Sequence, residues 1–96
     1  MNLLIPVDLD HTICPVAEAK LWLQVSVDGG KMQSIKEGET QDSFDEPSHI
    51  AVVQNDNEYV WPFIEQNMLV LVAHHQKSLD EIVEAYLFKE LNELAY

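Results

Sequence analysis

The second half of the chain reads HIAVV at residues 49–53, MLVLVA at residues 68–73 and SLDEIVEAYLFKEL at residues 78–91. Continuous apolar runs of four to eight residues are typical of strands that are buried on both faces. A short aromatic segment separates the two runs, and the third stretch has the spacing of an amphipathic helix. The order predicts a β-α-β-α unit, whose parallel strands bring their C-terminal ends to one edge of a sheet. Open α/β sheets bind ligands at that edge, so we expect functional residues there.

The first half of the chain predicts one buried strand and an antiparallel hairpin. Residues 3–7 (LLIPV) form an apolar run, with Pro6 expected near its end because proline cannot donate to a ladder. Residues 20–27 alternate apolar and polar side chains, as a half-buried strand does. The DGG sequence at 28–30 tolerates positive φ angles, and an extended pattern resumes at 31–35, so these residues should form the turn and second strand of a hairpin.

Residues 36–48, KEGETQDSFDEPS, are acidic and nearly devoid of apolar side chains apart from Phe44. Such a segment does not bury enough apolar surface to fold alone, so we expect a mobile loop. Two interpretations stay open for it. The charges can simply form a solvated face, or they can dock a basic partner with Phe44 as an aromatic anchor.

Two helices are expected. Residues 55–57 (NDN) can cap a helix over residues 58–66, which either starts late with Pro62 in its first turn or is short and partly 3₁₀. A second helix should run from Ser78 to about Leu91, because an S-x-x-E capping box precedes apolar residues at i, i+3 and i+4 spacing.

Composition limits the kinds of partner. With 96 residues the chain fits a single domain over residues 1–96. Five lysines, no arginine and 17 acidic residues give a net charge of −12, which disfavours nucleic acid and anionic membrane surfaces as partners. No apolar run reaches the roughly 18 residues needed to cross a bilayer, and the single cysteine fits a reducing compartment. The sequence therefore predicts a soluble, cytoplasmic protein.

The order of several short motifs resembles the dinitrogenase iron-molybdenum cofactor biosynthesis family, which includes carriers of the NifX and NafY kind and the C-terminal domain of NifB. The matching motifs are IPV at 5–7, CPVAE at 14–18, the hairpin at 19–30 and SLDEIVEAYL at 78–87. The resemblance implies an α/β, three-layer ribonuclease-H-like fold with a mixed sheet of about five strands in the order 3-2-1-4-5. It also implies a non-enzymatic carrier or accessory protein of iron-sulfur or iron-molybdenum cofactor assembly, with another cofactor-assembly protein as partner.

The chain departs from that family at its first loop. Members continue the loop with H-F-G-R, whose histidine is associated with holding the cluster, whereas here Glu18 is followed by Ala19-Lys20-Leu21. No residue inherits that histidine's role. The acidic residues 36–48 also stand where members carry a helix. A second class of function therefore stays open, a small interaction module of this fold that has lost cofactor binding.

Four side chains are candidates for holding a cluster or metal: His11 and Cys14 after the first strand, and His74 and His75 after the last predicted strand. The parallel arrangement should bring them to the same sheet edge, and thiolate and imidazole suit zinc, iron or a cluster. Neighbouring histidines on an extended chain point to opposite sides, so one of His74 and His75 should face the site. The alternative interpretation is a buried, inert Cys14 with solvated histidines.

An enzyme interpretation arises from residues 7–12, VDLDHT, which resemble the D-x-D-x-T signature of haloacid-dehalogenase-like phosphatases. In that chemistry Asp8 would be the nucleophile and Asp10 the acid or base, with Mg²⁺ bound to both. A hairpin follows the motif where that family has a helix, and the chain is too short for its sheet. We therefore expect no phosphatase activity.

Overall fold

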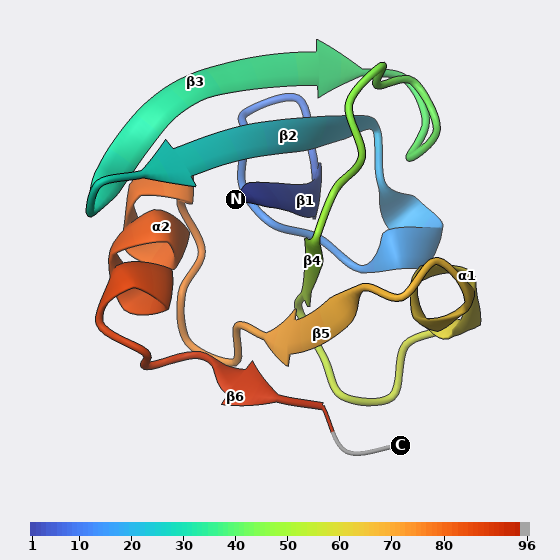
Figure 1. Ribbon diagram of the computed structural model, residues 1–96. Helices are drawn as coiled ribbons and strands as arrows, with labels where there is room; N and C mark the ends of the chain where they lie inside the picture. Colours follow the sequence, from blue (N-terminus) through green and yellow to red (C-terminus); the bar gives the residue numbers. More distant parts are fainter. Residues whose placement is uncertain (95–96) are drawn as a thin grey trace.

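The structure is a computed structural model that describes residues 1–94, and these residues form a six-stranded sheet in the order β3-β2-β1-β4-β5-β6 (Figure 1). The expected mixed sheet and its order 3-2-1-4-5 are confirmed, with one strand added at the end. The elements are β1 (Asn2–Val7), the 3₁₀ turn η1 (Val16–Glu18), β2 (Leu21–Asp28), β3 (Lys31–Gly38), β4 (Ile50–Val53), α1 (Trp61–Glu65), β5 (Leu69–Val72), α2 (Leu79–Leu87) and β6 (Asn92–Glu93).

The predicted hairpin is present. β2 and β3 are antiparallel, and Asp28 pairs with Lys31 across a two-residue loop. Gly29 and Gly30 have φ angles of 62° and 79°, the combination that a tight hairpin turn with matching twist requires. One bulge interrupts the ladder, because Ser26 pairs with Ser34 whereas Val27 pairs with Met32. The bulge places Met32 and Ile35 on the same face of β3, opposite Val27 and Val25.

β1, β4 and β5 are the parallel strands that the apolar runs predict. β1 pairs with β4 through Leu3 and Leu4 alone, and the two strands separate beyond that point. Pro6 lies in the separated part. Its carbonyl accepts a hydrogen bond from the loop that follows β1, so its missing N–H faces that loop and removes no bond from the β1–β2 ladder.

Apolar side chains of the sheet pack into two clusters, one on each face, as the alternation of side chains along a strand requires. α2 covers the face that carries Leu3, Ile5, Val25 and Val52. α1, η1 and residue Phe44 cover the opposite face. Figure 1 shows α2 and α1 on opposite sides of the sheet, so the expected three layers are confirmed.

The acidic segment begins later than expected, because residues 36–38 belong to β3. Its Phe44 is half-buried and packs against the apolar cluster on the α1 face of the sheet. The buried carboxamide of Gln24 donates to the Glu46 carbonyl (2.8 Å) and to Ser48 Oγ (2.9 Å). The segment therefore covers part of the sheet.

Both helices are shorter than predicted, for local reasons. α1 begins after Val60 with Pro62 in its first turn, and residues 55–57 do not cap it. α2 has the expected capping box between Ser78 and Glu81 but ends at Leu87. It ends in a Schellman motif, in which Lys89 adopts a φ of 59°. None of the helices within residues 1–94 is long and apolar enough to span a membrane.

Candidate functional site

The strand order reverses between β1 and β4, because the chain leaves β1 toward β2 and leaves β4 toward β5. Open α/β sheets bind ligands in the crevice at such a switch point. Here the protein's own chain fills the crevice. Residues 12–14 turn back along β1, with Ile13 bridged to Val7 and the Cys14 N–H donating to the Pro6 carbonyl (3.2 Å). The Ile13 N–H donates in turn to the carbonyl of Lys77 (2.9 Å).

Cys14 lies where this loop crosses the end of the sheet, since Ile13 belongs to the α2-side cluster and Val16 packs on the α1 side. The thiol is partly buried. Burial raises its pKa above the ordinary value, and the negative charges of Asp8, Glu18 and Glu58 raise it further, against a lowering by the Lys20 N–H. The sulfur is therefore protonated at neutral pH unless a cation compensates the carboxylates.

The raised pKa predicts a slow thiol. In the folded protein Cys14 should react with iodoacetamide at pH 8 more slowly than in the urea-unfolded chain, because the thiolate is the nucleophile. Above the pKa of the unfolded thiol, stability should fall as pH rises, since the unfolded chain ionises first. Mass-spectrometric alkylation rates measure the first effect. Glu18→Gln should speed the reaction and Glu90→Gln should not; equal rates in folded and unfolded protein would contradict the prediction.

His11 reaches the β2–β3 hairpin. Its Nε2 lies 2.6 Å from Oε1 of Glu37 on β3, which is an exposed hydrogen bond. Its backbone has a φ of 62° inside a tight turn. That turn is held by Asp8, whose Oδ1 accepts the N–H groups of Asp10 (2.8 Å) and Thr12 (3.0 Å).

His74 and His75 follow β5, which lies next to the β6 edge of the sheet, opposite the β3 edge. Nδ1 of His74 lies 3.1 Å from the carboxamide nitrogen of Asn92 on β6. The rings of His74 and His75 are tilted by 56°, with centroids 6.3 Å apart. Both histidines are exposed.

The four candidates thus share one end of the sheet, but His11 and His74 are held at its opposite edges. His11 is bonded to β3 and His74 to β6, which are five strand spacings of about 4.8 Å apart, or roughly 24 Å. Within residues 1–94 no group of three or more His, Cys, Asp and Glu side chains lies close enough to hold a metal ion. The four candidates therefore do not form one metal site together.

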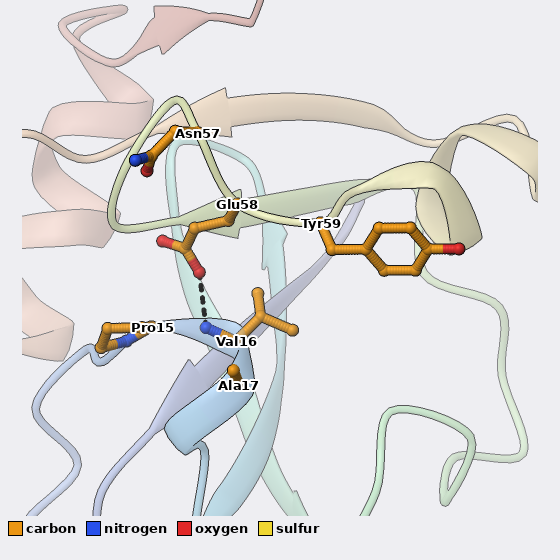
Figure 2. Close-up of a pocket in the computed structure, with 6 residues that line it drawn as sticks. All are labelled: Pro15, Val16, Ala17, Asn57, Glu58 and Tyr59. Carbon is orange, nitrogen blue, oxygen red and sulfur yellow. Dashed lines mark hydrogen bonds between the residues drawn. The ribbon is translucent and has the colours of Figure 1, made fainter.

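A cleft of about 390 Å³ opens beside Cys14, between the loops that follow the neighbouring strands β1 and β4 (Figure 2). It is lined by Pro15, Val16, Ala17, Asn57, Glu58 and Tyr59. The walls are mainly apolar. The Tyr59 ring is 69% exposed and points outward along the rim.

Glu58 holds the two walls together. Its Oε1 accepts the Val16 N–H (2.5 Å) from η1, and its Oε2 accepts the Asn55 N–H (2.7 Å) of its own loop. The carboxylate therefore lies between the two loops, as Figure 2 shows. No sequence motif indicates this cleft. The available signal was positional, because residues 15–17 and 57–59 each follow one of two adjacent parallel strands.

Solved structures share the whole fold. A crystal structure of a "putative dinitrogenase" from Methanocaldococcus jannaschii matches with a TM-score of 0.82 at 16% identity, covering 99% of this chain and 95% of that one. A crystal structure of PH0822 matches with a TM-score of 0.76 at 14% identity, covering 97% and 94%. No family model and no curated protein matches the sequence. The likeness shows the fold.

Proposed function

We propose that this chain is a non-enzymatic carrier or accessory protein of metal-cofactor assembly in the cytoplasm, with an iron-sulfur or iron-molybdenum cluster as cargo. The position of Cys14 carries the proposal. The one thiol of the sequence lies partly exposed at the switch point, beside an open cleft. The likeness of the whole chain to the structure described as a "putative dinitrogenase" of M. jannaschii supports the same class.

The chemistry fits a single protein ligand. Thiolate is the usual protein ligand of iron-sulfur clusters, and a bound metal would offset the carboxylate charges that keep the Cys14 thiol protonated. His11 and His74 are engaged with Glu37 and Asn92, far apart. The remaining ligands would come from the cargo itself or from the cofactor-assembly protein that we propose as partner.

Anaerobic titration with a synthetic [4Fe–4S] cluster tests the carrier function, followed by visible absorption. Wild-type protein should bind, and Cys14→Ser should weaken binding by about tenfold or more, because a hydroxyl is a poor cluster ligand. His74→Asn is the matched control, and it should bind as wild type does. Equal binding by wild type and Cys14→Ser would remove Cys14 from the site, and no binding by either protein would contradict the carrier function.

One observation favours a second function, an interaction module without cargo. No metal-binding group of three or more side chains is found in the part of the chain that is described, and carboxylates surround the single thiol. In this case neither wild type nor any variant should change the cluster's spectrum. The same titration thus separates the two functions.

We further propose that the chain is not a phosphatase. Asp8, the residue that would attack phosphorus, accepts two backbone N–H groups of its own turn through Oδ1. With Mg²⁺ and p-nitrophenyl phosphate, wild type and Asp8→Asn should both show background hydrolysis. Mg²⁺-dependent turnover that is lost in Asp8→Asn would restore the enzyme interpretation.

A further inference from the structure

The cleft beside Cys14 combines an apolar lining with one carboxylate in its wall. Val16, Ala17 and Tyr59 supply the apolar surface, and Glu58 supplies the charge. Each Glu58 oxygen accepts one backbone N–H, and Oε2 also accepts the Asn55 side-chain amide (3.4 Å). A carboxylate has about four lone-pair sites, so about one site, on Oε1, remains for a further donor.

The charge around the cleft has one sign. The lining residues include no lysine or histidine, and Glu18 and Asp56 stand next to them in the sequence. The whole chain carries −12 with no arginine. An anionic occupant would be repelled, whereas a cation would be attracted by both the local and the overall charge.

We infer that the cleft is a docking site for a lysine side chain, presented by a basic segment of a partner protein. The aliphatic stem would lie on Val16 and the Tyr59 ring, and the ammonium group would donate to Glu58. Lysine side chains divide in this way, with the stem on apolar surface and the charge at a polar site. Exposed tyrosine rings are frequent anchors of protein interfaces. This inference goes beyond the proposed carrier function and does not depend on the cargo.

The test uses three probes with the same short alkyl chain: n-butylammonium, n-butanol and butyrate. Two-dimensional ¹H–¹⁵N NMR of the cluster-free protein reports binding residue by residue. Butylammonium should shift the amides of residues 16–17 and 57–59, butanol should shift them less at equal concentration, and butyrate least. The butylammonium shifts should diminish as NaCl rises from 0.05 to 0.5 M, because salt screens the ion pair.

Three variants identify the site. Glu58→Gln should weaken butylammonium binding about three- to fivefold, as expected for the loss of one exposed ion pair. Ala17→Leu fills the cleft without touching a hydrogen bond, and it should weaken binding even if Glu58→Gln disturbs the loops. Phe88→Ala removes an equally exposed ring (70%) outside the lining residues and should change nothing. Shifts spread over the whole surface, or equal shifts with butyrate, would overturn the inference.

Discussion

Replacing Phe63 by alanine is expected to lower the free energy of unfolding by about 3–5 kcal/mol. The Phe63 ring is 1% exposed and lies 5.9 Å from the ring of Trp22, tilted by 57°. α1 has five residues and no side-chain cap, so packing of this ring is what attaches the helix to the sheet. Urea denaturation followed by circular dichroism measures the effect.

The matched control lies two residues away. Trp61 is also a large aromatic residue of the same helix, but it is 54% exposed. Trp61→Ala should change stability by no more than about 0.5 kcal/mol. Similar losses for Phe63→Ala and Trp61→Ala would show that helix propensity, and not burial, holds α1 in place.

Gly38→Ala is the second large effect, with an expected loss of about 1–3 kcal/mol. A Cβ at residue 38 would lie 2.6 Å from Ser43 Cβ and 2.9 Å from Phe44 Cζ. The acidic segment would have to move off the end of β3, which would loosen Phe44 from the α1 face of the sheet. Thermal unfolding followed by near-ultraviolet circular dichroism reports both stability and aromatic packing.

A double-mutant cycle isolates the cause. In a Ser43→Gly background the nearest clashing atom is absent, so Gly38→Ala should cost at least about 0.5 kcal/mol less than in wild type. Strictly additive losses would mean that the clash with Ser43 is not responsible.

The sequence predicts elements well where local chemistry suffices. Apolar runs identify β1, β4 and β5, Asp28-Gly29-Gly30 identifies the hairpin turn, and Ser78 with Glu81 identifies the start of α2. Each of these signals is contained within a few residues. The resemblance to a family then supplied the strand order, which periodicity alone does not contain.

The misses depend on contacts between distant residues. Leu91 continues the helical spacing of α2 and packs on the same core cluster, but it does so after a Schellman turn at Lys89. The spacing of apolar residues therefore predicts helix up to Leu91, where the chain already leads into β6. Likewise, residues 55–57 resemble a helix N-cap, but α1 begins only at Trp61. The Asn55 N–H instead donates to the Glu58 carboxylate within the loop.

The candidate residues lie at the end of the sheet that the strand directions predict, but the sequence does not predict how far apart they lie along it. Loop position follows from strand direction, so Cys14 and the histidines share that end. Their lateral separation follows from hydrogen bonds to Glu37 and Asn92, whose strands are the two edges of the sheet. Such side-chain partners are set by the whole fold, and no pattern in the sequence encodes them. Whether Cys14 binds a cluster stays a prediction.

The bulge in β3 bears on how copies of this protein behave at high concentration. β3 is an edge strand with exposed side chains along most of its length, a geometry that invites sheet extension from one molecule to the next. An antiparallel approach of two copies that sets Met32 opposite Ile35 also sets Lys31 opposite Lys36, at both ends of the pair. Like charges directly opposite are unfavourable, and the bulge disturbs the straight row of donors and acceptors. We therefore expect β3 to resist edge-to-edge pairing with a second copy, although it is an exposed edge of the sheet.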